Sequence, residues 1–153
     1  RKDFLVHPVQ LWEARVAGAS AALLIVRSLA PDLLPRLMDA AQEAGLALLV
    51  EVRDEAELER ALAVSAPVIG VNNRNLETLV IDPTTAPRVI RQMPPHIVAV
   101  AESGMRSPAD AQPAADAGAD ALLVGSAVSA SASPSDDVRA LAGIARRARP
   151  ATS

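Results

Sequence analysis

The stretch Ile97-Val98-Ala99-Val100-Ala101-Glu102-Ser103-Gly104 decides the fold. Its first five residues form an apolar run, the pattern of a strand that is buried on both faces of a sheet. The run then ends in a carboxylate, a hydroxyl and a glycine. An ionised carboxylate at the end of a buried strand is costly unless it is paired or used. The stretch therefore predicts a buried strand that delivers polar groups to a ligand site.

Three further apolar runs end in the same way. They are residues 48–50 before Glu51, residues 68–71 before Asn72-Asn73-Arg74, and residues 121–124 before Gly125-Ser126. The carboxyl ends of parallel strands meet at one edge of a sheet, where α/β proteins bind their ligands. The four runs together predict one ligand site built from strand ends.

Composition limits the function classes. The chain has 153 residues, half of them hydrophobic, which is enough for one domain with a sizeable core. The formal charge of -3 argues against nucleic acid as the main partner. No apolar run approaches the roughly 18 residues of a membrane span, so we expect no membrane partner. Without cysteine there are no disulfides and no thiolate metal sites. The chain begins with Arg1 rather than Met, so we expect a piece of a longer protein.

Strand and helix patterns alternate along the whole chain. Strands are predicted at 21–26, 46–52, 68–71, 97–101 and 121–124, and helices at 8–18, 31–44, from 54, 83–92, from 107 and 136–147. Two helix stops, Gly18 and Gly45, lie 27 positions apart (45 − 18), which matches about 250 residues shared by eight strand–helix units. Alternation at this pitch predicts a parallel sheet. We expect a (β/α)8 barrel rather than a doubly wound sheet, because no GxGxxG follows an early strand.

The first helix and the last helix carry two more expectations. Val9, Trp12 and Val16 share a face of the first helix, so we expect them to be buried, with Trp12 as a core residue. The arginine cluster at 146–149 is interpreted as the solvated end of the last helix.

Two Gly-Ser pairs predict a phosphate site. Ser103-Gly104 and Gly125-Ser126 follow consecutive strands, and barrels frequently bind phosphate with the loops after their last two strands. Glycine lets the backbone approach an anion, while N–H groups and hydroxyls donate to it. Each pair alone is a weak signal, because such pairs are common in turns.

Charged and amide side chains supply candidates for the chemistry. Glu51 and Glu102 could act as acid, base or cation stabiliser, or they could be structural carboxylates in salt bridges. Lys2 could donate a proton or bind an anion, or it could be a solvated terminal residue. Asn72 and Arg74 suit a carboxylate or phosphate, or they could support a turn.

Six segments follow one another in order along the chain: RKDF (1–4), EAR (13–15), LVEV (49–52), GVNNRNL (70–76), AESG (101–104) and LVGS (123–126). This ordered set resembles the indole-3-glycerol phosphate synthase family. The resemblance implies a (β/α)8 TIM barrel of the α/β class, of which residues 1–150 would form units three to eight, with 151–153 as a tail. It implies a cytoplasmic tryptophan-pathway enzyme that closes the indole ring of 1-(2-carboxyphenylamino)-1-deoxyribulose 5-phosphate, losing carbon dioxide and water, with no metal or organic cofactor.

The resemblance also implies roles for individual residues. Lys2 would be the general acid on the substrate carbonyl, and Glu51 would take part in proton transfer. Asn72, Arg74 and Glu102 would line the substrate and stabilise a cationic intermediate. The phosphate would be held by Ser103, Gly104, Gly125 and Ser126.

The family pattern includes two earlier units that this sequence does not contain. Those units carry a glutamate, a lysine and a Ser-Pro-Ser phosphate loop. We therefore expect the 153-residue chain to be inactive alone and to self-associate through open barrel edges. Two alternatives stay open: another phosphate-binding barrel enzyme, such as a sugar-phosphate isomerase, and a non-catalytic module that keeps only the phosphate site.

Overall fold

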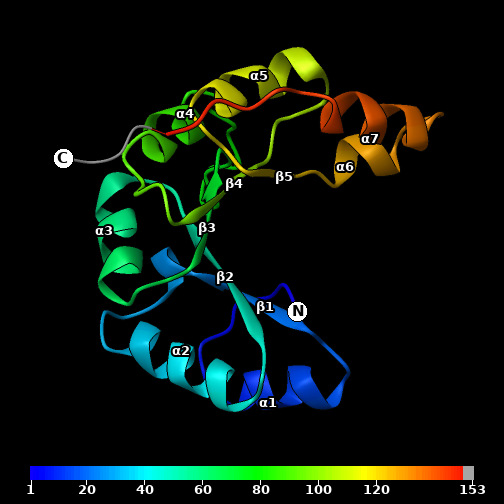
Figure 1. The fold of residues 1–153 in the computed structure, drawn as a ribbon. Helices are drawn as coiled ribbons and strands as arrows, with labels where there is room; N and C mark the ends of the chain where they lie inside the picture. Colours follow the sequence, from blue (N-terminus) through cyan, green and yellow to red (C-terminus); the bar gives the residue numbers. More distant parts are fainter. Residues whose placement is uncertain (150–153) are drawn as a thin grey trace. The chain divides into compact units, whose positions relative to one another are not determined.

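The computed structural model of the protein describes residues 1–149, so the predicted tail at 151–153 lies outside the described residues. Strands and helices alternate, as predicted (Figure 1). The strands are β1 (Ala21–Ile25), β2 (Ala47–Val52), β3 (Val68–Asn72), β4 (Val98–Glu102) and β5 (Ala121–Leu123), and their order in the sheet is β1-β2-β3-β4-β5. The helices are α1 (Val9–Val16), η1 (Val26–Ser28), α2 (Leu33–Glu43), α3 (Glu55–Ala63), α4 (Thr85–Ile90), α5 (Pro108–Asp116), α6 (Ser126–Ser129) and α7 (Pro134–Ala142). The predicted parallel α/β architecture of the TIM-barrel type is confirmed.

The chain divides into two compact units, Arg1–Ile69 and Gly70–Ser153. In the first unit, β1 and β2 pair in parallel, from Ala21 opposite Ala47 to Ile25 opposite Glu51. Helix α2 packs against β2 and buries one apolar face. The fully buried members are Leu34, Leu37 and Ala41, and Leu33 and Met38 are half-buried.

The expected packing of α1 is wrong. Its exposed side chains are Val9, Trp12 and Val16, of which Trp12 keeps 44% of its surface exposed. The buried residues are Leu11 and Ala14, on the face by which α1 packs near α2. Both faces of this helix are apolar, so spacing alone could not select the packed one.

The start of α3 is held by a charged network. Asp54 caps the helix and accepts a hydrogen bond from the Glu57 N–H at 3.0 Å. The buried Glu57 carboxylate accepts from the Arg53 N–H at 2.8 Å and from Arg27 Nε at 2.6 Å. The same arginine donates to Asp54 at 2.8 Å. Charge-assisted bonds of this kind fix the turn that follows Glu51.

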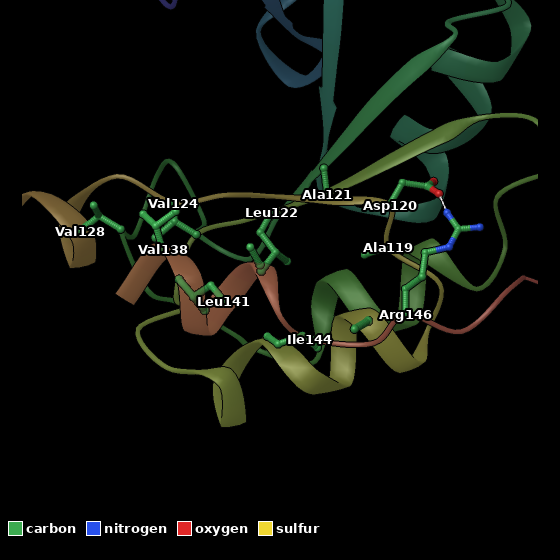
Figure 2. Close-up of a pocket in the computed structure, with 12 residues that line it drawn as sticks. Ala119, Asp120, Ala121, Leu122, Val124, Val128, Val138, Leu141, Ile144 and Arg146 are labelled. Carbon is green, nitrogen blue, oxygen red and sulfur yellow. Dashed lines mark ion pairs between the residues drawn. The ribbon is translucent and has the colours of Figure 1, made fainter. Parts of the chain in front are cut away.

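The second unit contains β4, β5 and α4–α7. Strands β4 and β5 pair in parallel, with Val100 opposite Ala121 and Glu102 opposite Leu123. A cavity of about 460 Å³ lies against β5 and α7 and is lined mainly by aliphatic residues such as Leu122 (Figure 2). None of the predicted site residues lines it.

The last predicted helix ends earlier than expected. Helix α7 stops at Ala142, and the segment that follows runs in extended form past α5 and α4 (Figure 1). The Arg147 N–H donates to Ala115 O at 3.0 Å. Arg149 is not solvated: its side chain is 3% exposed and donates to the carbonyls of Gly118 and Ile97. The Arg149 guanidinium is buried because these two carbonyls accept its hydrogen bonds, and a solvated helix end would not provide such acceptors.

We predict that Glu57→Gln destabilises the first unit. The amide would turn a donor toward Arg27 and replace a charge-assisted bond, at a cost of about 1–3 kcal/mol in unfolding free energy. Urea unfolding followed by Trp12 fluorescence measures this, because the single tryptophan lies in the first unit. The exposed Glu59→Gln on the same helix is the control. Equal stability of the two variants would contradict the prediction.

Candidate active site

In the first unit, a lysine meets a buried carboxylate at the end of β2. Lys2 Nζ lies 3.2 Å from Glu51 Oε2, although 49 positions separate them in the sequence. The Glu51 side chain is 3% exposed, whereas that of Lys2 is 60% exposed. A buried carboxylate needs such a partner to remain ionised. The arrangement places an exposed ammonium group directly on a buried carboxylate.

The backbone beside Lys2 is anchored on both sides. The backbone nitrogen of Arg1 donates to Ala21 O at 2.6 Å, and the Leu23 N–H donates to Arg1 O at 2.9 Å, so residue 1 pairs alongside β1. The Arg1 guanidinium reaches Glu13 and Asp3, each at 3.2 Å, and holds the pKa of Asp3 below its ordinary value. Lys2 therefore projects from a fixed backbone.

Lys2 is the only lysine of the chain. All the other residues in its total of 15 lysines and arginines are arginine. An arginine keeps its proton in proteins, whereas a lysine can give one up. The chain's one lysine therefore pairs with the buried Glu51 carboxylate.

In the second unit, a closed loop follows β3. The Arg74 N–H donates to Asn72 Oδ1 at 2.9 Å, so this asparagine does support a turn. Arg74 also pairs with Ile81 in an antiparallel bridge, and its guanidinium donates to Leu79 O at 3.3 Å. The hydrogen bonds fold the loop back on itself and hold Asn72 and Arg74 near the end of β3.

The turn after β4 lies against that loop. Glu102 is 2% exposed, and its carbonyl accepts the Asn73 N–H at 3.0 Å. Ser103 and Gly104 both have left-handed backbones, with φ of 65° and 86°. A Cβ on Gly104 would lie 2.8 Å from the Ile81 side chain, so only glycine fits the close approach of the loop.

Helix α5 begins directly after this turn. Ser107 caps the helix and donates its hydroxyl to Asp110 at 2.9 Å, which holds the pKa of Asp110 below its ordinary value. The Arg106 N–H, which donates to the same carboxylate at 3.1 Å, adds to this effect. The cap limits the turn to the few residues between β4 and α5.

Gly125 and Ser126 occupy the matching position on the neighbouring strand. Glu102 pairs with Leu123 at the end of the β4–β5 ladder, and both Gly-Ser pairs follow within three residues of this pair. Ser126 begins the short helix α6. This is the placement that the sequence predicts for the second Gly-Ser pair.

The comparison with known proteins identifies the family. Residues 1–141 match indole-3-glycerol phosphate synthase. The chain belongs to the indole-3-glycerol phosphate synthase family. An indole-3-glycerol phosphate synthase of Streptomyces griseus is 54% identical over 125 residues, which cover 82% of this chain and 46% of that protein. One of Opitutus terrae is 52% identical, over 84% of this chain and 48% of that protein. The chain thus spans about half the length of these relatives.

Solved structures show the same fold at low identity. A mandelate oxidase mutant aligns with a TM-score of 0.69 at 16% identity, over 94% of this chain and 57% of that chain. The native KDPGal structure aligns with a TM-score of 0.64 at 16% identity, over 90% of this chain and 64% of that chain. These likenesses support the barrel-type fold of an indole-3-glycerol phosphate synthase family member.

Within each unit, the structure brings together residues that the sequence singled out. The first unit joins Lys2 and Glu51, and in the second unit Asn73 joins the loop after β3 to the turn after β4. Sequence reasoning missed Asn73, a buried neighbour of both loops. The Asn-Asn doublet itself gave no signal to distinguish the two amides.

Within residues 1–149, no group of three or more His, Cys, Asp or Glu side chains could hold a metal ion. No described helix has the length and hydropathy of a membrane span.

The Lys2–Glu51 pair can be observed directly. Reductive methylation with ¹³C-formaldehyde labels only the single lysine and the chain's amino terminus. We predict that Glu51→Gln moves the Lys2 dimethylamine resonance, because the ammonium loses its carboxylate partner at 3.2 Å. Glu59→Gln, the matched control, leaves that resonance in place. Unchanged spectra for both variants would show that the pair does not form in solution.

Proposed function

We propose that this chain takes part in the indole-3-glycerol phosphate synthase reaction. In this reaction a carbon–carbon bond forms between the aromatic ring and the sugar carbonyl of 1-(2-carboxyphenylamino)-1-deoxyribulose 5-phosphate. Carbon dioxide then leaves the ring, and the former carbonyl oxygen leaves as water. The family match over residues 1–141 and the lysine–glutamate pair of the first unit support the proposal. The family match does not favour the alternative of a sugar-phosphate isomerase.

Lys2 is the proposed general acid. Ring closure turns the carbonyl oxygen into an alkoxide, which needs a proton as the new bond forms. The Lys2 side chain is 60% exposed, and its ammonium group is paired with the Glu51 carboxylate. The ammonium group can therefore present that proton to a substrate. Glu51 then accepts a proton in a later step, and its burial keeps water from competing for it.

The loops of the second unit are the proposed binding elements. Glu102 is a buried carboxylate suited to a cationic intermediate, with Asn72 and Arg74 lining the same ligand. The backbone and hydroxyl donors at Ser103, Gly104, Gly125 and Ser126 are the proposed phosphate site. No metal or organic cofactor is invoked in any of these roles, and the cytoplasmic location stays a prediction.

The observation that carries the proposal is the contact of the only lysine with the buried Glu51. The test is a chimera in which the part of the Streptomyces griseus relative that precedes the matched region is fused ahead of Arg1. We predict measurable indole-3-glycerol phosphate formation by the chimera and little or none by the 153-residue chain alone. A missing general acid or base costs about 10²–10⁴ in rate, and the expected earlier units carry more than one such group.

Single variants of the chimera separate chemistry from folding. Lys2→Gln and Glu51→Gln should each lower kcat by about 10²–10⁴. The exposed Arg36→Gln and Glu59→Gln should leave kcat within about twofold, because neither side chain lies at a strand end. A folded chimera that forms no indole product, or that keeps its rate without Lys2, would contradict the proposed function.

We also propose that the chain self-associates in solution. Strand β5 stands at one end of the sheet order, and its Leu123 is 42% exposed. Unpaired strand edges with apolar side chains promote pairing between chains. Light scattering after size exclusion should give a mass above 15.9 kDa that falls on dilution. A monodisperse monomer at all concentrations would contradict this prediction.

A further inference from the structure

Asn73 forms hydrogen bonds within the second unit through its backbone N–H, its backbone carbonyl and both polar atoms of its side chain. It is 3% exposed. Its backbone N–H donates to Glu102 O at 3.0 Å, and its carbonyl accepts the Asp82 N–H at 2.9 Å. Its side-chain Oδ1 accepts the Ala86 N–H at 2.8 Å, and Nδ2 donates to Ser103 O at 3.0 Å. One buried amide thus joins the end of β4, the loop after β3 and the start of α4.

The bond to Ser103 falls on a strained residue. Ser103 has a φ of 65°, a conformation that residues other than glycine rarely adopt. Such a conformation persists only where the surroundings determine it. The Asn73 Nδ2 donor holds the Ser103 carbonyl at the side where the left-handed backbone places it.

Fixing that carbonyl also aims the next N–H. The peptide unit is planar and trans, so the Gly104 N–H points opposite to the Ser103 C=O and therefore away from Asn73. Among the described residues, the Gly104 N–H has no hydrogen-bond acceptor. An outward N–H in a glycine turn is the kind of donor that cradles an anion.

We propose that Asn73 is a positioning residue, which holds the Ser103–Gly104 turn in the conformation that binds the substrate phosphate. This inference rests on the proposed function, because the phosphate role of that turn does. Asn73 lies between Asn72 and Arg74, so the same bonds also fix the spacing between the phosphate-binding turn and the two side chains that line the substrate.

The test is a titration of the ¹⁵N-labelled chain with glycerol 3-phosphate, followed at the Ser103 and Gly104 amides. Asn73→Asp keeps an acceptor for the Ala86 N–H and removes the donor to Ser103. We expect the Kd to rise roughly tenfold, the equivalent of about one hydrogen bond. The matched control is Asn75→Asp, which places the same charge in the same loop. Asn75 bonds to the Glu77 and Thr78 N–H groups instead, so we expect a Kd within about twofold of the parent value.

A double-variant cycle separates positioning from general stability. Glycine adopts a φ of 65° without strain, so a Ser103→Gly chain does not need the Asn73 hydrogen bond to hold residue 103 in this conformation. In that background we expect Asn73→Asp to weaken binding less than about threefold. If Asn73→Asp raises the Kd by the same factor in the parent chain and in the Ser103→Gly chain, the inference is overturned. If Asn73→Asp does not fold by circular dichroism, Asn73→Ala, which removes the side-chain donor without adding a charge, takes its place in the cycle.

The outcomes distinguish the inference from the proposed function. If the parent chain binds glycerol 3-phosphate and Asn73→Asp binds it equally well, the positioning role is overturned and the phosphate site stands. If the parent chain shows no binding and no shift at Ser103 or Gly104, the phosphate site fails and the positioning role fails with it.

Discussion

Polar groups at the end of a buried strand must find partners, and this constraint organises the protein. In the first unit, Glu51 lies one residue before the end of β2 with 3% of its side chain exposed, and Lys2 supplies the counter-charge from a distant part of the sequence. In the second unit, β3 and β4 end in side chains and carbonyls that bond to each other through Asn73. The strands thus deliver groups that are costly to bury, and the loops that satisfy those groups become the ordered part of the candidate site.

The supporting structure follows from the same constraint. Glu57 is buried behind the turn that follows Glu51, and it is satisfied by Arg27 and by a backbone N–H. Asp110, at the start of α5, accepts hydrogen bonds from the Arg106 N–H and the Ser107 hydroxyl, just after the Ser103–Gly104 turn. Helices α3 and α5 therefore each begin with a carboxylate that ties down the short loop before it.

Family membership and fold likeness answer different questions here. Relatives of the indole-3-glycerol phosphate synthase family are 47% to 54% identical to this chain, and they place it within one family. A mandelate oxidase mutant reaches a TM-score of 0.69 at 16% identity, which shows that the strand–helix frame serves proteins of other kinds. The frame does not fix the chemistry, and the groups that distinguish this chain are Glu51 and Glu102 near strand ends and the Lys2 that pairs with Glu51.

The sequence by itself determined the class of fold, the positions of the strands and the polar groups at their ends. Apolar runs of the right length, closed by charged, amide or glycine residues, are a local signal, and Glu51, Glu102 and the Gly-Ser pairs lie where that signal placed them. The tertiary structure alone decided which face of α1 is buried, because that helix is apolar on two sides and only its packing near α2 selects Leu11 over Trp12. It also decided the role of Asn73. Two adjacent asparagines are chemically the same in a sequence, and only the backbone path turns one into the buried link between two loops.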